Sequence, residues 1–174
     1  MASPELSDPN FADTVVLLLD ADDDGALGVV LNRPSRVPVE QVLDAWGDVV
    51  DDPEVLFQGG PVGTDGALAV ALASDPDGAA GFRAVSGPLG ILDLDTPTAL
   101  VVGTVERLRI FAGYAGWGAG QLEGEIARGD WYVVPATYDD VFAADTLGLS
   151  RRVLRRQPGE LAMHATRPAD PALN

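Results

Sequence analysis

The apolar residues of this chain come in short runs, and each run is closed by glycine, proline or aspartate. None of the runs approaches the roughly 18 consecutive apolar residues that a membrane-spanning helix needs. Short apolar runs between turn-forming residues are typical of strands and short helices. With 174 residues, 47% of them hydrophobic, the chain is long enough for one domain with a substantial core. We therefore expect a single α+β domain over residues 1–174, with loose tails at 1–7 and 166–174.

Acidic residues dominate the charge, which is −16 at neutral pH, and nearly all of the excess lies in residues 1–100. Such a surface repels phosphate backbones and acidic membranes. The chain has no lysine, which excludes Schiff-base chemistry and lysine-dependent phosphate sites, and no cysteine, which excludes disulfides and thiolate chemistry. The N-terminal residues lack the basic start and apolar stretch of a secretory signal. We expect a cytoplasmic protein that does not contact a membrane.

Residue patterns predict a sheet with a few helices. Thr14–Pro34 is typical of a hairpin, because two apolar runs flank an Asp/Gly turn. Further strands are expected at 54–58, 66–73, 82–85, 90–94, 109–114, 131–135 and 160–165. Helices are expected at 37–47, 121–128, 136–143 and 150–157. A helix is also expected at 95–109, where a possible cap at Thr96 and Pro97 favours it, although the Val-rich middle suits a strand as well.

Four glycines crowd residues 113–120, between an apolar run and a short charged segment. A glycine-rich turn between a strand and a helix can bind phosphate, but the Walker motif requires a lysine, and this chain has none. The dinucleotide fingerprint G-x-G-x-x-G is not met either, since Gln121 or Glu123 occupies its third glycine position. We interpret the segment as a sharp corner of the backbone and expect no cofactor.

Four motifs occur in a recognisable order: "DPNFADTVVLLL" at 8–19, "GALGVVLNRP" at 25–34, "GGPV" at 59–62 and "GYAGWGAGQLEGEI" at 113–126. The chain thereby resembles the YqgE/AlgH family of bacterial proteins from about residue 4 to residue 174. Its ending, "RRVLRRQPGELAMHAT" and "DPALN", resembles the actinobacterial branch. Members usually carry a further apolar segment before the first motif, where this chain has only "MASPEL". A shortened start would leave a sheet edge unpaired, at some cost in stability or solubility.

The resemblance implies a bifurcated, mostly antiparallel sheet that curls into a pseudo-barrel with flanking helices. It also implies a transcriptional regulator, a role attached to the family by genetic association, and it supplies no catalytic residues. We accordingly expect a non-enzymatic regulator that binds a protein or a small ligand.

One candidate site joins residues that follow strands: Asn32, Arg33, Gly59, Gly60, Trp117 and Gln121. In a shared pocket, Arg33 could hold an anion against the flat wall of Trp117. The chain would then be an enzyme or an anion-binding protein. The alternative interpretation is three unrelated turns, each of which needs glycine or proline for its backbone.

A second candidate is the basic helix with Arg151, Arg152, Arg155 and Arg156, which could contact nucleic acid or an acidic protein segment. Alternatively, these arginines pair with the many acids of the chain or cover apolar surface with their stems. The net charge makes direct contact with nucleic acid the less favoured interpretation.

We expect no metal site. Asp20, Asp22, Asp24 and Gly25 match the opening of a calcium-binding EF-hand loop, but the twelfth position is Leu31 and the flanks favour strands. The single histidine, His164, has no cysteine or second histidine with which to share a metal.

Overall fold

The computed structural model describes residues 1–164, so the expected tail at 166–174 lies outside the described residues. The strands are β1 (Val16–Asp22), β2 (Gly25–Val30), β3 (Pro34–Pro38), β4 (Val55–Gln58), β5 (Val62–Ala73), β6 (Phe82–Ser86), β7 (Leu89–Leu92) and β8 (Val105–Gly118). The helices are α1 (Thr98–Val101), α2 (Gln121–Ala127), α3 (Tyr138–Val141), α4 (Leu149–Arg155) and α5 (Glu160–His164). Two 3₁₀ turns, η1 (Val39–Gln41) and η2 (Asp44–Trp46), follow β3.

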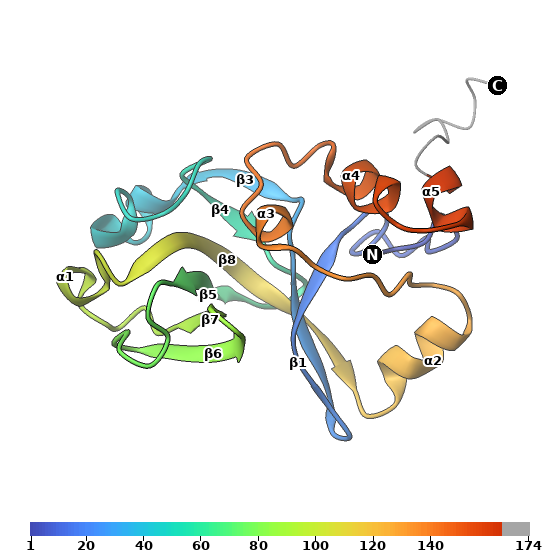
Figure 1. Cartoon of the computed structure of the whole chain (residues 1–174), viewed down its shortest axis with the longest axis horizontal. Helices are drawn as coiled ribbons and strands as arrows, with labels where there is room; N and C mark the ends of the chain where they lie inside the picture. Colours follow the sequence, from blue (N-terminus) through green and yellow to red (C-terminus); the bar gives the residue numbers. More distant parts are fainter. Residues whose placement is uncertain (165–174) are drawn as a thin grey trace.

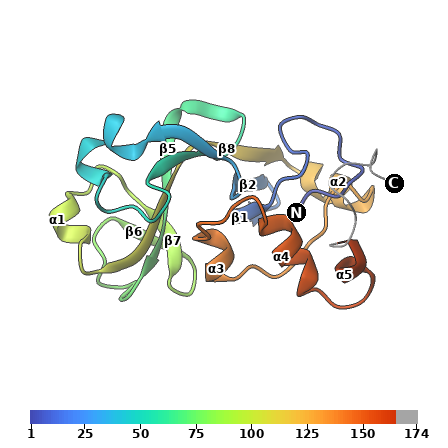
Figure 2. The ribbon, with the colours of Figure 1, turned by 90° about the horizontal axis from the view of Figure 1, so that it is seen from above.

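The strands form one curled sheet in the order β1-β2-β8-β5-β7-β6, with β3 and β4 on a side branch (Figure 1). All pairings are antiparallel except that of β4 with β8. Helix α3 lies near the middle of the sheet, α4 and α5 follow it toward the side where the N-terminus lies, and α2 follows β8 (Figures 1 and 2). The expected α+β fold with a mostly antiparallel, bifurcated sheet is confirmed.

Strand β8 is the element at which the sheet divides. One of its edges pairs with β5 over most of its length. Its other edge is shared, since β4 pairs at Phe111 and Ala112 while β2 pairs with residues 115–118. The two branches therefore separate near Gly113, within the glycine-rich segment.

Gly59 and Gly60 lie at this fork, where backbones approach closely. The Gly59 N–H donates to the carbonyl of Ala112 at 2.9 Å, and its own carbonyl accepts from the Val30 N–H at 2.9 Å. A Cβ added to Gly59 would stand 2.3 Å from the Gly113 oxygen, and one on Gly60 would stand 2.2 Å from the backbone of Tyr114. Only residues without a side chain fit here.

Arg109 in β8 is the largest fully buried side chain among residues 1–164. Its guanidinium donates to the carbonyls of Val141 at 2.8 Å and Asp52 at 2.9 Å, and its central carbon lies 4.2 Å from the Phe57 ring centroid. Burial lowers the pKa of Arg109 to about 10. The side chain thus joins α3 and the loop before β4 to the middle of the sheet.

The hairpin at Thr14–Pro34, the strands at β4, β5, β6 and β7, and the helices α2, α3 and α4 appear where the sequence predicts them. Thr137 precedes α3 in a capping box with Asp140. The turn between β1 and β2 is closed by the Asp22 carboxylate, which accepts from the amides of Asp24 and Gly25. The acidic run is therefore flanked by strands, which is not the helical context of an EF-hand.

Two predicted helices are wrong over most of their length. At 37–47 the chain ends β3 and makes only the two 3₁₀ turns, because the Val39 amide bonds to Glu54 and Val42 turns out to solvent. At 95–109 only the four residues of α1 are helical, and Val105 already begins β8. The stretch that begins at Val105 pairs with β5, and this pairing outweighs the local preference for a helix.

The glycine-rich corner and two predicted strands also need correction. Strand β8 continues past Gly113, whose φ is +68°, and ends at Gly118, and the chain leaves the strand for α2 at Gly120, whose φ is +70°. Residues 131–135 form no strand; a single bridge joins Trp131 to Ala2. Residues 160–164 are helical in α5.

The N-terminal residues are packed against the domain. Met1, Ala2 and Ser3, which the sequence placed in a loose tail, are buried. Ala2 donates its N–H to Thr14, and Ser3 donates to Asp130. Within residues 1–164, no helix combines the length and apolarity needed to cross a membrane.

Candidate ligand site

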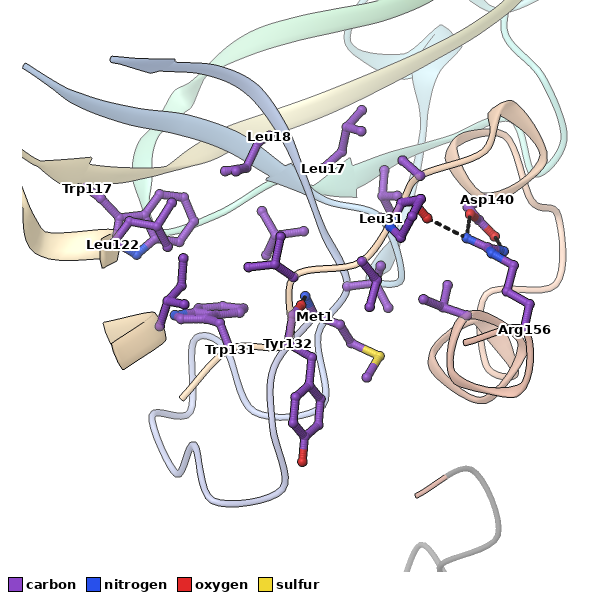
Figure 3. A pocket seen from close by; sticks show the side chains of 18 residues that line it. Met1, Leu17, Leu18, Leu31, Trp117, Leu122, Trp131, Tyr132, Asp140 and Arg156 are labelled. Atoms are coloured by element: carbon purple, nitrogen blue, oxygen red, sulfur yellow. Dashed lines mark hydrogen bonds and ion pairs between the residues drawn. The ribbon is translucent and has the colours of Figure 1, made fainter. Parts of the chain in front are cut away.

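An apolar pocket of about 200 Å³ opens between β1, α2, the segment 131–136 and α4 (Figure 3). We call it the apolar pocket. Its lining comes from five stretches of the chain: Met1; Val15, Val16, Leu17, Leu18 and Leu31 of the hairpin; Trp117, Leu122 and Ile126 around α2; Trp131, Tyr132, Val133, Val134, Pro135 and Ala136; and Asp140, Val153 and Arg156. Carbon atoms dominate this lining, and the only ion pair in it stands at one end (Figure 3).

Helix α2 forms one wall of the apolar pocket because its start is held tightly. Gly120 takes the left-handed conformation that ends the run from β8, and the Gln121 side chain accepts from the Gly118 N–H at 3.1 Å. Leu122 and Ile126, four residues apart, lie on the same helical face and line the pocket.

Two tryptophans form the flat part of the lining, and one carboxylate orients both. The indole N–H groups of Trp117 and Trp131 donate to the same oxygen of Glu125, at 2.9 and 2.8 Å. The other oxygen of Glu125 accepts from the Gln121 side chain at 3.0 Å. Phe11 stacks on Trp117 with centroids 5.8 Å apart and meets Trp131 edge to face at 5.6 Å. The aromatic rings are thus fixed in place before any ligand arrives.

Glu125 stays charged in this setting. Its partial burial acts to raise the pKa, but the hydrogen bonds from Trp131, Gln121 and Trp117 favour the charged form and leave the pKa below its ordinary value. The carboxylate therefore remains an acceptor for both indoles at neutral pH.

The polar end of the apolar pocket is the ion pair of Asp140 and Arg156. Arg156 donates to both carboxylate oxygens of Asp140, at 2.7 Å for one of them, and to the Pro135 carbonyl at 3.0 Å. Asp140 also accepts from the amide and hydroxyl of Thr137. Burial opposes the charge on Asp140, but these bonds from Arg156 and Thr137 outweigh it and lower its pKa. The hydrogen bond between Arg156 and Asp140 also raises the pKa of Arg156.

The predicted Arg33 site is arranged differently from the expectation. The Arg33 guanidinium donates to the carbonyls of Asn10 at 2.7 Å and of Pro9 and Ala12, each at 3.1 Å. Asn32 accepts from the Val15 amide and donates to the Asp13 carbonyl, both at 2.9 Å. These two side chains hold the loop before β1 against the hairpin.

Of the six residues in that candidate site, the apolar pocket includes Trp117 alone. Gly59 and Gly60 stand at the fork of the sheet, and Gln121 supports α2. Sequence reasoning missed Trp131, Glu125 and the start of β1 as parts of one site. A signal was present, since two tryptophans flank a short helix that carries two glutamates, Glu123 and Glu125.

The basic helix is α4, and its arginines divide into two kinds. Arg152 pairs with Asp145 at 2.8 Å, and Arg156 pairs with Asp140. Arg151 and Arg155 are exposed, and neither has an ion pair within residues 1–164. Half of the basic cluster is therefore engaged in pairing with acids of the same chain.

A second, more polar depression of about 420 Å³ lies beside Asp51, Asp52, Glu54 and Arg107. Arg107 forms an ion pair with Asp51 and donates to the Phe142 carbonyl. In the part of the chain that the structure describes, no group of three or more acidic or histidine side chains could hold a metal ion.

A family model described as AlgH-like matches residues 1–162. The chain belongs to the AlgH family. The resemblance seen in the four motifs is thereby confirmed. Among curated relatives, UPF0301 proteins of Thermobifida fusca and Streptomyces coelicolor are 52% and 53% identical to this AlgH-family chain, and each alignment covers 100% of the chain and 92% of the relative. A UPF0301 protein of Mycobacterium tuberculosis is 44% identical, with 100% and 88% covered.

Two solved structures share the fold of this AlgH-family chain. The crystal structure of protein DIP2367 from Corynebacterium diphtheriae is 30% identical, with a TM-score of 0.90 over 96% of this chain and 89% of that one. The solution structure of the AlgH protein from Pseudomonas aeruginosa is 29% identical, with a TM-score of 0.73 over 98% and 92%.

Proposed function

We propose that this AlgH-family chain is a cytoplasmic regulator without catalysis of its own, and that it acts by binding an apolar ligand in the apolar pocket. The observation that carries this proposal is the pair of tryptophans held by Glu125 at the wall of an apolar cavity. Concave apolar sites with a few fixed polar groups are the usual form of a ligand site in proteins.

The size of the apolar pocket defines the class of ligand. An engineered apolar cavity of about 150 Å³ binds benzene. At about 200 Å³, this pocket has room for a ring or a short branched chain. The ligand would lie against the faces of Trp117 and Trp131, with the Asp140–Arg156 pair at its far end.

The position of the apolar pocket supports a regulatory role. Its walls come from parts of the chain that are distant in sequence: the hairpin, α2, the segment 131–136 and α4. A ligand that contacts all four walls stabilises the conformation in which the walls lie together. Binding therefore increases the population of that conformation. Helix α4, with Arg151 and Arg155 exposed, would present this change to a partner.

The alternative proposals have less support. An anion at Arg33 would compete with three backbone carbonyls that already accept its donors. Direct DNA binding through α4 would rest on Arg151 and Arg155 against a net charge of −16.

Ligand-observed NMR with toluene as the probe tests the main proposal. We expect saturation transfer from the wild-type protein to toluene and its loss in Leu18→Trp, which fills the apolar pocket with a larger side chain. Leu147→Trp is the matched control, because Leu147 is 96% exposed and lies outside the lining. Equal transfer in all three proteins, or none in the wild type, would refute the proposal. Salt-dependent retention on DNA that Arg151→Ala and Arg155→Ala abolish would favour α4 instead.

A further inference from the structure

Helix α4 is fixed to the domain by one face and leaves the opposite face open. Leu149 and Val153, four residues apart, are buried in the core. Each residue of an α-helix is rotated by about 100° from the one before, so Arg151 and Arg155, two residues further on, lie on the other side. Both arginines are exposed. The packing of α4 therefore directs these two guanidinium groups into solvent.

Arg151 and Arg155 also lack an acidic neighbour of their own. The other two arginines of α4 form ion pairs, whereas Arg151 and Arg155 form none within residues 1–164. Arg36 and Arg83 are likewise exposed and unpaired in this part of the chain, but each stands singly, on β3 and on β6. On α4 two such arginines share one helical face, about 6 Å apart along the axis.

The sequence around α4 reverses the charge of the rest of the chain. Residues 146–159 contain four arginines and no aspartate or glutamate, although the whole chain has 27 acidic and 11 basic residues. Two of the four arginines are neutralised by ion pairs. The other two, Arg151 and Arg155, keep their charge and form a small basic surface on an acidic protein.

Leu147, in the turn directly before α4, adds an apolar contact beside this basic surface. Its side chain is 96% exposed. The turn is held in place, because Arg152 donates to the carboxylate of Asp145 at 2.8 Å and to its backbone carbonyl at 2.7 Å. We call Leu147, Arg151 and Arg155 the α4 face. Each of its members follows the previous one by four residues.

We propose that the α4 face binds an acidic segment of a partner protein, with one carboxylate on each of Arg151 and Arg155 and an apolar side chain over Leu147. The inference goes beyond the proposed function, since this binding requires no ligand in the apolar pocket. A guanidinium group holds a carboxylate through two parallel N–H donors, which makes arginine well suited to such contacts. The charges of the two partners are complementary, and this complementarity gives the interaction its specificity.

The charge distribution of the chain favours a short acidic segment over a nucleic acid. Nearly all of the acidic excess lies in residues 1–100, outside α4. Salt at physiological strength screens charges beyond about 8 Å, so a short segment on α4 meets mainly the local arginines. A nucleic-acid backbone extends further and needs many cationic contacts, which the acidic remainder of the chain does not supply.

The spacing of the α4 face defines the form of the segment. Alternate residues of an extended chain lie on the same side, about 6.6 Å apart. Acidic residues at alternate positions therefore match the separation of about 6 Å between Arg151 and Arg155. A leucine at the next alternate position would lie against Leu147.

The test uses the blocked peptide Leu-Ala-Glu-Ala-Glu as the probe, and the control peptide has glutamine in place of both glutamates. Binding to the protein is followed by the amide NMR shifts of residues 147–156. With the glutamate peptide we expect saturable shifts in these residues, a Kd of about 1 mM or tighter, and at least about tenfold weaker binding of the glutamine peptide. Raising the salt from about 50 to about 300 mM should weaken binding several-fold, because exposed charges are screened.

Variants of the protein locate the site. Arg151→Glu combined with Arg155→Glu is expected to weaken binding of the glutamate peptide at least about tenfold, because it opposes like charges. Arg36→Glu combined with Arg83→Glu is the matched control, since it changes the net charge equally at exposed positions of β3 and β6. Leu147→Ser should weaken binding about threefold, through loss of the apolar contact. Equal binding of the two peptides, or equal losses in the two double variants, would overturn the inference.

Other outcomes assign the α4 face differently or separate it from the apolar pocket. Tighter binding of a DNA duplex at residues 147–156 would assign the face to nucleic acid and overturn the inference. Self-association at low salt that the Arg151→Glu and Arg155→Glu pair abolishes would assign it to a second copy of this chain, with the same consequence. Absence of shifts with up to about 10 mM glutamate peptide would also overturn it. Saturation transfer to toluene in that protein would leave the proposed function standing.

Discussion

The indole rings of Trp117 and Trp131 meet edge to face, with centroids 5.8 Å apart and planes inclined by 80°. Trp117 lies one residue before the end of β8 and Trp131 follows α2, so this contact joins the two ends of the segment that contains the helix. Glu125, in the middle of that helix, accepts from both indoles. Contacts among Trp117, Glu125 and Trp131 thus hold this wall of the apolar pocket in place.

Replacing Glu125 by alanine should loosen this wall. Two indole N–H groups would lose their shared acceptor, and we expect a loss of about 1 to 3 kcal/mol in the free energy of unfolding. Urea denaturation followed by tryptophan fluorescence measures it. Glu123→Ala is the control, since Glu123 is exposed on the same helix and should change stability by less than about 0.5 kcal/mol. Equal effects of the two variants would contradict the shared-acceptor role.

Asp140 should make stability depend on pH. Its pKa in the folded protein is lowered, so it stabilises the fold fully above its unfolded pKa of about 3.9, and this contribution is lost as pH falls through the folded value. Asp140→Asn should therefore cost about 2 to 3 kcal/mol at pH 7, and the difference from wild type should shrink below about pH 4.

Urea titrations of the Asp140→Asn variant at several pH values check this, with exposed Asp139→Asn as the neighbouring control. A difference from wild type that stays constant down to pH 3 would show that the ionised carboxylate contributes nothing specific.

Alanine at Gly59 should destabilise the fork of the sheet. The new Cβ would stand 2.3 Å from the Gly113 oxygen, so the two branches must move apart, at a cost of at least about 2 kcal/mol. Gly124→Ala is the matched control, because Gly124 lies inside α2 and its added Cβ meets nothing closer than 3.6 Å. That variant should gain about 0.5 to 1 kcal/mol. Thermal unfolding of both proteins gives the comparison.

Loss of the Arg33 side chain should release the loop before β1. Three carbonyls of residues 9–12 would lose their donors, so Arg33→Ala should speed hydrogen exchange and proteolysis in residues 8–14. Arg36→Ala, at an exposed position of β3, should leave both unchanged. An unaltered loop in Arg33→Ala would mean that the other contacts of residues 8–14 suffice to hold it.

Local patterns predicted the hairpin, most strands, and the helices α2, α3 and α4. They succeeded where a local signal decided the structure, as at α3, which begins directly after Thr137. They failed where pairing decides the structure. Val105 joins a strand because β5 lies beside it, whereas residues 131–135 form no strand and make only the bridge from Trp131 to Ala2.

The candidate site was predictable only in part. Trp117 could be named from the glycine-rich motif, but its partner Trp131 and the start of β1 come together only through the tertiary fold. Arg33 looked available for an anion because its acceptors are the backbone carbonyls of Pro9, Asn10 and Ala12. Every residue has such a carbonyl, so the sequence does not indicate which ones bind an arginine.

Native mass spectrometry of the protein purified from its own host, beside the Leu18→Trp variant, tests the central claim most directly. We expect a bound small apolar molecule on the wild-type protein and its absence from the variant that fills the apolar pocket. Identical spectra of the two folded proteins would contradict it.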